Sequence, residues 1–428
     1  MRKFVLLNLI VLSFFIFNSC EDTITEQHVY TANVPVYMPN DEFKAAFKVV
    51  DPQELENPGK IYFKDNYIFI NEMYKGIHIY DNSDPSNPQN ISFIELPSNL
   101  DIAIANNYLY ADSYTDLVVI DISDISNPTE IYRIDSAFPY SIPPYDTRYP
   151  ISDIDESKGV VIGYDIKELT EERTVSEEEL KGRNIFISEG WGFFGQNGIS
   201  SDAGSGSSVG IAGSMSKFMI YDHYLYTLFL SQMKLFDISI LDQPVESNQV
   251  YIRNNIETLF LYKDKMFIGS QSGMFIYDLS TPGNPSYLSA FEHARSCDPV
   301  VVENDIAYVT LRSGSLCDGF LNQLDVLDVS DVTNPIHLKT YSLTNPHGLG
   351  IDNGTLFICD GESGLKIFDA QDPYSITDNQ IAHFGNINSK DVIPLGDILL
   401  MIGDDGLYQY DYSDPTDLKL LSKIAVKQ

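Results

Sequence analysis

The sequence is poor in basic residues. It has 27 Lys and Arg against 61 Asp and Glu, which gives a formal net charge of −34. Phosphate binding needs a basic surface, so this deficit argues against nucleic acid as a partner and against electrostatic attachment to anionic lipid. Charged residues are nevertheless only 21% of the chain, and Tyr and Phe number 27 and 24. This composition excludes wholesale disorder.

Long apolar runs are absent except at the N-terminus. The run Phe4–Phe17 follows two basic residues and is shorter than the roughly 20 residues of a membrane-spanning helix. It fits the apolar region of a secretory signal peptide, and the Ser-Cys pair ending at Cys20 resembles a bacterial lipobox. The alternative is a plain signal peptide with an incidental cysteine.

The lipobox resemblance implies how the chain is processed and where it is located. We expect a lipoprotein signal peptide at residues 1–19, a lipidated N-terminus and tether at 20–42, and one domain at 43–428. The expected partner at this end is the membrane, through the lipid on Cys20. The expected location is the cell envelope, at the outer membrane of a Gram-negative-type bacterium.

A short apolar motif that ends in aspartate recurs along the chain. Leu117–Asp121 reads Leu-Val-Val-Ile-Asp, and the closing aspartates are Asp81, Asp121, Asp237, Asp278, Asp328, Asp369 and Asp411. Their spacings are 40, 116, 41, 50, 41 and 42 residues. A proline stands seven residues after the aspartate in five units and four residues after it in the last two.

Each unit also carries three more short segments rich in β-branched and aromatic residues. In the fourth unit the predicted strands are Ile256–Tyr262, Lys265–Ser270, Gly273–Asp278 and Ser286–Phe291. Four strands in about 40–45 residues, repeated, predict an all-β protein: a β-propeller of four-stranded blades. No unit holds the long helical period of an α-solenoid, and a single Trp with no Trp-Asp pair excludes WD40 repeats.

Leu117–Asp121 and its sister units resemble the LVIVD repeat of bacterial secreted proteins, and the whole chain resembles LVIVD-repeat lipoproteins. The resemblance implies a β-propeller and implies no particular activity. The recurrent aspartate has two interpretations. We expect it to accept hydrogen bonds from N–H groups of the following turn rather than to bind calcium, because the turns lack the ligand pattern of an EF-hand loop.

The interval between Asp121 and Asp237 is about 75 residues longer than one repeat. We interpret residues 136–214 as an insertion between the second and third complete repeats, with an extra hairpin as one option. The rival interpretation is a degenerate eighth blade. Seven blades are favoured because the interval lacks the Asp-to-Pro turn. Its Gly-Ser-Ser-Val-Gly stretch at 206–210 matches the G-x-S-x-G pattern of a nucleophilic serine. We do not expect a nucleophile there, because the low-complexity sequence around it does not predict the strand–turn–helix that this pattern requires.

The chain has only four cysteines. Export would place Cys297, Cys317 and Cys359 in an oxidising compartment. In a four-stranded meander, Cys297 and Cys317 fall at the same end of one blade, which makes a disulfide between them reasonable. Cys359 is expected to be a buried small hydrophobic residue.

The same end of the propeller collects polar residues from neighbouring blades. Candidates for a ligand or cation pocket at the channel mouth are His347, Asp298, Asp360, Asp391 and Asp404, and Arg312 falls beside them. The alternative is that these residues cap turns and form a solvated acidic rim.

Catalytic templates are missing: the seven histidines include no pair spaced for zinc, and no phosphate-binding glycine loop occurs. We therefore expect no cofactor, no resident metal and no enzymatic activity, but a monomeric binding or scaffold protein for a protein or glycan ligand. The alternative is an envelope hydrolase with a metal or carboxylate site at the channel mouth.

Overall fold

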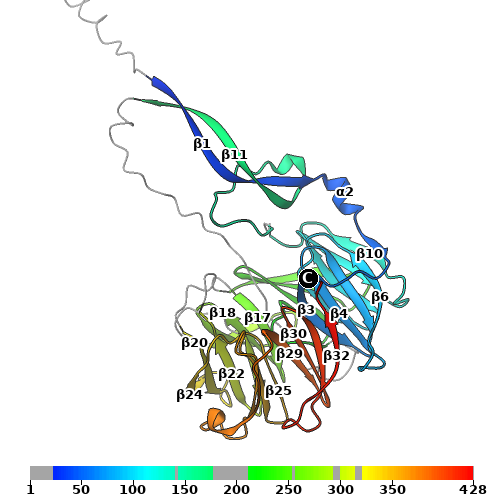
Figure 1. Ribbon diagram of the computed structural model, residues 1–428, viewed down its shortest axis with the longest axis vertical. Helices are drawn as coiled ribbons and strands as arrows, with labels where there is room; N and C mark the ends of the chain where they lie inside the picture. The colour runs from blue at the N-terminus through cyan, green and yellow to red at the C-terminus, as the bar shows by residue number, and fades with distance from the viewer. Residues whose placement is uncertain are drawn as a thin grey trace, which may run out of the picture. The chain divides into compact units, whose positions relative to one another are not determined.

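The computed structural model describes residues 23–139, 143–176, 211–252, 256–292, 299–313 and 321–427. Seven antiparallel sheets, each built on four consecutive strands, follow one another around a propeller ring (Figure 1). The prediction of an all-β propeller is confirmed, and so is the preference for seven blades; the eight-blade alternative is wrong. The chain divides into two compact units, one holding β1 and β11 and the other holding all seven blades.

The blades run in chain order. The first is β3 (Pro58–Lys64), β4 (Tyr67–Glu72), β5 (Gly76–Asp81) and β6 (Gln89–Glu95), extended by β2 (Lys48–Val50) beside β6 and by β12 (Ile211–Ala212) beside β3. The second is β7 (Ile102–Ala105), β8 (Tyr108–Ser113), β9 (Asp116–Asp121) and β10 (Thr129–Ile134). The third is β13 (Phe218–Tyr221), β14 (Tyr224–Phe229), β15 (Gln232–Asp237) and β16 (Val245–Tyr251).

The remaining four blades repeat the pattern. The fourth is β17 (Ile256–Tyr262), β18 (Lys265–Ser270), β19 (Gly273–Asp278) and β20 (Ser286–Glu292), which matches the predicted strands to within one residue. The fifth is β21 (Val300–Glu303), β22 (Ile306–Leu311), β23 (Gln323–Asp328) and β24 (Ile336–Ser342). The sixth is β25 (Leu349–Asp352), β26 (Thr355–Cys359), β27 (Leu365–Asp369) and β28 (Gln380–Phe384), and the seventh is β29 (Ser389–Leu395), β30 (Ile398–Gly403), β31 (Gly406–Asp411) and β32 (Lys419–Ala425).

Burial follows strand position within a blade. The first strands of neighbouring blades contact one another around the axis, and the second and third strands are buried on both faces. The fourth strands, such as β20 and β32, are mainly exposed or half-buried. The third strand therefore carries the nearly continuous apolar run that marks each repeat, because neighbouring blades cover both of its faces.

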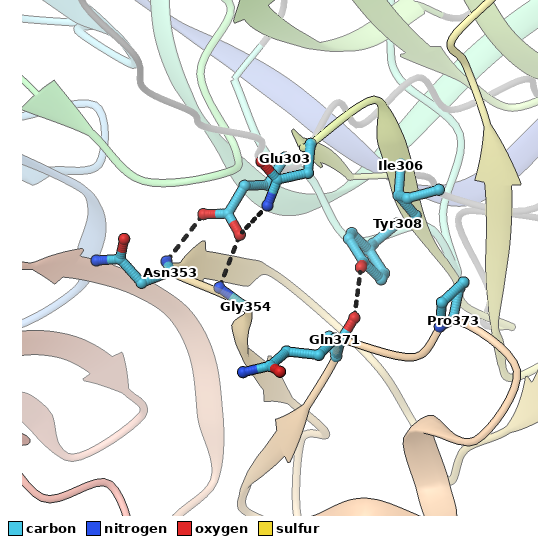
Figure 2. Close-up of a pocket in the computed structure, with 9 residues that line it drawn as sticks. Glu303, Ile306, Tyr308, Asn353, Gly354, Gln371 and Pro373 are labelled. Atoms are coloured by element: carbon cyan, nitrogen blue, oxygen red, sulfur yellow. Dashed lines mark hydrogen bonds between the residues drawn. The ribbon is translucent and has the colours of Figure 1, made fainter.

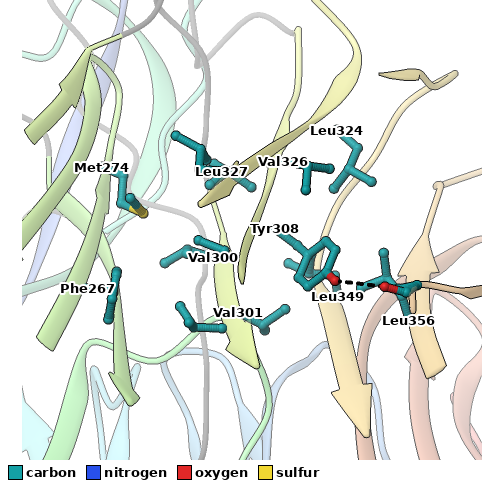
Figure 3. Packing of buried hydrophobic residues seen from close by; sticks show 14 of the residues in the cluster. Phe267, Met274, Val300, Val301, Tyr308, Leu324, Val326, Leu327, Leu349 and Leu356 are labelled. Carbon is teal, nitrogen blue, oxygen red and sulfur yellow. Dashed lines mark hydrogen bonds between the residues drawn. The ribbon is translucent and has the colours of Figure 1, made fainter. Parts of the chain in front are cut away.

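The core lies between blades rather than within them. One cluster joins the fourth, fifth and sixth blades, with Phe267 and Met274 on one side, Tyr308 and Val326 in the middle and Leu356 on the other side (Figure 3). Since a sheet buries its faces only against its neighbours, each blade depends on the two beside it. Full burial of each such side chain contributes about 1.5–3 kcal/mol.

The repeated aspartate caps the turn that follows it, as predicted. In all seven units its Oδ1 accepts a hydrogen bond from the N–H two residues on, at distances from 2.8 Å at Asp81 to 3.1 Å at Asp278. The Ser280 hydroxyl also donates to Asp278 and holds the pKa of that carboxyl below its usual value.

These capped turns also join neighbouring blades. Tyr226 in the third blade donates its hydroxyl to the carbonyl of Pro282 in the turn of the fourth, at 2.8 Å. Tyr110 reaches Leu241 in the same way, and Tyr308 reaches Ala370. The repeat motif thus makes a turn and presents it to the preceding blade.

The two ends of the ring close without exchanging a strand. Leu55 forms a parallel bridge with Val426, and the N–H of Lys427 donates to the Leu55 carbonyl at 2.7 Å. An apolar cluster with Ile68 and Leu400 at its centre fills the space between the first and seventh blades.

The other unit is a two-stranded ribbon. β1 (Thr23–Met38) pairs antiparallel with β11 (Val160–Ser176) along their whole length, with a bulge after Val36 (Figure 1). Its first strand lies in the segment expected to be the tether and its second in the insertion, a pairing that the sequence did not reveal. Short helical turns occur at α2 (Asn40–Lys44), η1 (Glu156–Lys158) and η2 (Ile376–Asn379), and no helix among the described residues is long and apolar enough to cross a membrane.

Candidate functional site in the central channel

The C-terminal end of the insertion enters the central channel. Ile211 and Ala212 pair with Phe63 and Tyr62 on the inner strand of the first blade, which adds β12 on the axial side of β3. The following residues continue to β13. The channel segment, residues 211–217, is therefore part of the propeller core.

Two serines fix the channel segment to inner strands around the ring. The Ser214 hydroxyl donates to Asp391 Oδ1 of the seventh blade at 3.1 Å and accepts from the N–H of Leu349 of the sixth at 2.8 Å. Ser216 contacts Asp101 Oδ1 of the second blade at 3.2 Å, and its carbonyl accepts from the N–H of Leu259 in the fourth. Small residues are needed here because the channel is narrow: a Cβ at Gly213 would stand 2.8 Å from Asp391 Oδ2.

Asp101 is the centre of a buried polar network. Its carboxylate pairs with the Lys60 ammonium and accepts from the Tyr62 hydroxyl. The N–H of Lys217 donates to Asp101 Oδ2 at 2.7 Å. With Asp101 2% exposed, these donors compensate the desolvation of a buried carboxylate.

A second buried carboxylate, Asp112, lies at the end of β8. The N–H groups of Leu100 and Asp101 each donate to its Oδ1 at 2.8 Å, and Asn99 Nδ2 donates at 2.9 Å. Burial outweighs these bonds and raises the pKa of Asp112 to about 7. The carboxyl therefore links β8 to the residues that lead into β7, the inner strand of the same blade.

Of the predicted site residues, Asp360 is fully buried. Its Oδ1 accepts from the N–H of Thr344 at 3.1 Å and of Asn345 at 2.7 Å, and its Oδ2 pairs with Lys366 Nζ at 2.5 Å. These partners belong to its own blade and the turn that enters it. The carboxylate therefore holds that turn against the sixth blade, with Lys366 of β27 balancing its charge.

Asp391 is 3% exposed and lies between two glycines. A Cβ at Gly348 would stand 2.1 Å from its Oδ1. Among the residues that the structure describes, none bonds to its Oδ2, and burial raises the pKa of the carboxyl to about 7. Asp391 is thus a carboxyl that tends to keep its proton and is packed against the channel segment.

His347 and Asp404 lie farther out. Arg312 Nη1 stands 3.1 Å from His347 Nδ1 and 3.3 Å from Nε2, so the guanidinium contacts both ring nitrogens. Burial, with help from the charges of Arg312 and Lys390, lowers the pKa of His347 to about 3, and the ring is neutral. Asp404 is half-exposed and pairs with Lys390. The structure therefore brings His347 close to the Lys390–Asp404 pair, while Asp360 and Asp391 serve internal contacts.

Other predicted residues lie outside the described part of the chain: Cys20, Cys297, Cys317 and Asp298. The Cys297–Cys317 disulfide therefore stays a prediction. Cys359 is described, free and buried, and burial raises the pKa of its thiol well above the usual value. Within the described ranges, no three His, Cys, Asp or Glu side chains converge as a metal site would require.

The sequence did not single out the buried residues Lys60, Asp101 and Asp112 or the channel segment. Their one sequence signal is position: Lys60 and Asp101 stand near inner-strand starts and Asp112 near a second-strand end, at the end of the propeller already marked by His347. A comparison of the residues at the inner-strand starts and second-strand ends of all blades would have identified these three.

A separate hollow of about 370 Å³ lies between the fifth and sixth blades, at the opposite end of the strands. Glu303 spans it and accepts from the N–H of Asn353 at 2.9 Å and of Gly354 at 2.7 Å (Figure 2). Tyr308 and Pro373 form part of its wall. Its polar contacts serve to join the two blades.

Comparison with protein families matches the LVIVD repeat to residues 59–93, 99–136 and 294–342, which lie in the first, second and fifth blades. The chain carries LVIVD repeats. The aspartate-capped turn of these LVIVD repeats recurs in the other four blades as well. No curated protein matches the chain.

Several solved structures are similar in outline. The computationally designed Ika8 protein is 9% identical over 87% of this chain and 88% of its own, with a TM-score of 0.49. A functionally unknown protein from Desulfotomaculum acetoxidans DSM 771 is 11% identical over 84% and 95%, also at 0.49. Kluyveromyces lactis Hsv2 is 10% identical over 88% and 98%, at 0.46. At these TM-scores the similarities support no functional argument.

Proposed function

We propose that this protein is a cell-envelope lipoprotein whose propeller is a non-catalytic binding surface for a protein or glycan ligand. The observation that carries the proposal is that three buried aspartates near the channel mouth are hydrogen-bonded to the protein itself. Asp101, Asp360 and Asp391 are 2%, 0% and 3% exposed and accept hydrogen bonds from the protein itself. A catalytic acid or base has to come within hydrogen-bond reach of a substrate.

The propeller supports a binding role because hydrogen bonds join neighbouring blades into one framework, and exposed loops on such a framework commonly carry binding sites. Capped turns and inter-blade tyrosines hold the blades, while loops that connect them are free to differ in sequence. Function on such a fold has to come from the site rather than from the fold.

Anchoring is tested by replacing Cys20 with Ser. The variant should move from the membrane fraction to the soluble fraction, because it lacks the acceptor for the lipid. Cys359→Ser is the matched control and should stay with the membrane. If Cys20→Ser remains membrane-bound, the lipobox interpretation is wrong.

Binding is tested with the released Cys20→Ser protein, labelled and added back to cells that lack it. We expect saturable binding that unlabelled protein displaces. The bound ligand should be recovered chemically unchanged. A ligand that is cleaved during the incubation would favour the hydrolase alternative instead.

A further inference from the structure

The hollow between the fifth and sixth blades lies at a level where most junctions between blades carry a tyrosine. Three positions occur at this level: the last residue of a first strand, the first residue of a second strand, and the residue after the capping aspartate of the next blade. At five of the seven junctions, a tyrosine at one of these positions packs against the neighbouring blade or hydrogen-bonds to it. The five are Tyr67, Tyr108, Tyr224, Tyr262 and Tyr412.

The junction of the fifth and sixth blades has no tyrosine at the three positions. They are Glu303, Ile306 and Ala370, and all three line the hollow of about 370 Å³. This volume falls within the roughly 300–1,000 Å³ of small-ligand pockets. Two other lining residues, Asn353 and Gln371, are exposed. The hollow is therefore a space that solvent reaches and that the side chains of the repeat leave unfilled.

Tyr224 shows how a phenol ring fits at this level. It is the first residue of β14, as Ile306 is the first residue of β22. Its hydroxyl lies against the turn of the next blade, because a Cβ at Gly283 would stand 2.7 Å from it. Ile306 is shorter, and the space beside it extends to Pro373 in the turn of the sixth blade. The hollow thus has two apolar walls where the third blade has a tyrosine ring.

Tyr412 shows which polar partner such a phenol takes. It follows the capping Asp411 of the seventh blade, as Ala370 follows that of the sixth. The Tyr412 hydroxyl donates to Asp352 Oδ2 at 2.7 Å. Asp352 is the last residue of β25, and Glu303 is the last residue of β21. The fifth blade therefore presents a carboxylate at the position that accepts a tyrosine hydroxyl one junction later.

Glu303 has acceptor capacity left. Its Oε1 accepts from the N–H of Asn353 at 2.9 Å, and its Oε2 accepts from the N–H of Gly354 at 2.7 Å and from Asn304 Nδ2 at 3.4 Å (Figure 2). Since a carboxylate oxygen accepts two hydrogen bonds, Oε1 retains one position toward the described part of the chain. The carboxylate and the net charge of −34 disfavour an anionic ligand and favour a neutral hydroxyl donor.

We propose that this hollow binds a tyrosine side chain of a partner protein, with the ring between Ile306 and Pro373 and the hydroxyl donating to Glu303. The proposal rests on the proposed binding function and narrows the ligand to a protein. Tyrosine suits such a site because it buries a large apolar ring and keeps one polar group, and tyrosines that fill pockets often dominate protein interfaces.

The test is fluorine NMR on the pentapeptide Gly-Gly-Tyr-Gly-Gly made with 3-fluorotyrosine, titrated with the Cys20→Ser full chain at neutral pH. The fluorine resonance should shift saturably. Unlabelled tyrosine pentapeptide should displace the probe. Its phenylalanine and phosphotyrosine counterparts and methyl glucoside should compete roughly 10-fold less well, because they lack the neutral phenol hydroxyl.

Two variants fill the hollow with the protein's own tyrosine. Ile306→Tyr copies Tyr224 and Ala370→Tyr copies Tyr412, so both should abolish probe binding and leave circular dichroism unchanged. Ile398→Tyr is the matched control, since it makes the same substitution at the first residue of β30 in the seventh blade, and it should bind the probe like wild type.

Glu303→Gln separates the hydrogen bond from the shape of the hollow. It should weaken binding of the tyrosine peptide several-fold and leave the phenylalanine peptide unaffected, whereas a distorted hollow would weaken both. No probe binding, equal competition by the phenylalanine peptide, better competition by methyl glucoside, or filled variants that bind like wild type would each overturn the proposal. Saturable binding to cells that Ile306→Tyr and Ala370→Tyr both retain would overturn this inference and leave the broader binding function standing.

Discussion

Asn82 and Gln409 exchange two side-chain hydrogen bonds across the seam between the first and last blades. Asn82 Nδ2 donates to Gln409 Oε1 at 2.9 Å, and Gln409 Nε2 donates to Asn82 Oδ1 at 2.7 Å. Both residues are buried, at 5% and 0% exposure. Because the first and last blades meet at this seam, the pair adds to the Leu55–Val426 bridge and the apolar cluster that close the ring.

The seam pair should show strong energetic coupling. Asn82→Ala or Gln409→Ala alone leaves a buried amide without its partner, which costs about 1–3 kcal/mol. The double variant should cost less than the sum, by about 1–2 kcal/mol. A double-mutant cycle in urea measures the difference, and strict additivity would show that the two amides act independently.

The capped turns should contribute to stability without a metal. Asp278→Ala removes the acceptor for the Ser280 N–H and the partner of Lys265, at 3.1 Å in each case. Since the turn is exposed and water replaces part of the bonding, the cost should be about 1 kcal/mol, or 1–2 °C in Tm. Asp278→Asn should lose less, and Asp417→Ala serves as a control outside the capped position. The loss should be equal in chelator and in millimolar calcium; a calcium-dependent rise in Tm seen only with Asp278 present would reverse the interpretation.

Asp391 should make the protein less stable as the pH rises. Its pKa is raised from 3.8 to about 7 by burial, so the native state keeps a proton that the unfolded chain has released. Stability is therefore lost between about pH 4 and 7, by about 1.4 kcal/mol for each unit of pKa shift. Asp391→Asn keeps an acceptor for Ser214 but has no proton to lose, so its advantage over wild type should grow across this range.

The control for Asp391 is internal. Asp112, whose pKa burial also raises to about 7, is present in both proteins, and its effect cancels in the comparison. Urea unfolding at half-unit pH steps measures the difference. A stability difference that stays constant from pH 4 to 8 would mean that Asp391 is ionised in the folded protein.

His347 should act in the opposite direction. The pKa of His347 in the folded protein, about 3, lies below the usual 6.5. Between these pH values the unfolded chain therefore binds a proton at His347 that the native state does not bind. This stability is present above pH 6.5 and is lost as the pH falls towards 3. NMR titration should show a neutral His347 at pH 5, and Arg312→Gln should raise its pKa by removing a neighbouring positive charge. A His347 resonance that titrates near 6.5 in wild type would contradict the described environment.

The cysteines allow a chemical check of the strand register. Cys359 is fully buried and its thiol pKa is raised, so it should resist alkylation in the native protein and react after unfolding. Non-reducing peptide mapping should link Cys297 to Cys317 and leave Cys359 free. A bridge that includes Cys359 would show that the predicted placement of the other two is wrong.

The sequence alone determined the repeating unit. The strand Gly273–Asp278 and its turn depend on interactions within a few residues: an apolar run, a carboxylate and the N–H two positions later. Such local patterns are repeated seven times, so blade type and blade number could be inferred from spacing. The same logic placed His347 and Arg312 at one end of the propeller.

Only the tertiary structure decided what fills the channel. Ser214 bonds to Asp391 across 177 residues of sequence, and Ser216 bonds to Asp101 across 115. No local pattern encodes which strand a Gly- and Ser-rich segment will meet, because its affinity comes from single hydroxyls and close backbone approach. For the same reason the sequence could list the acids of the mouth but could not tell that Asp360 holds a turn or that Asp391 faces the channel segment.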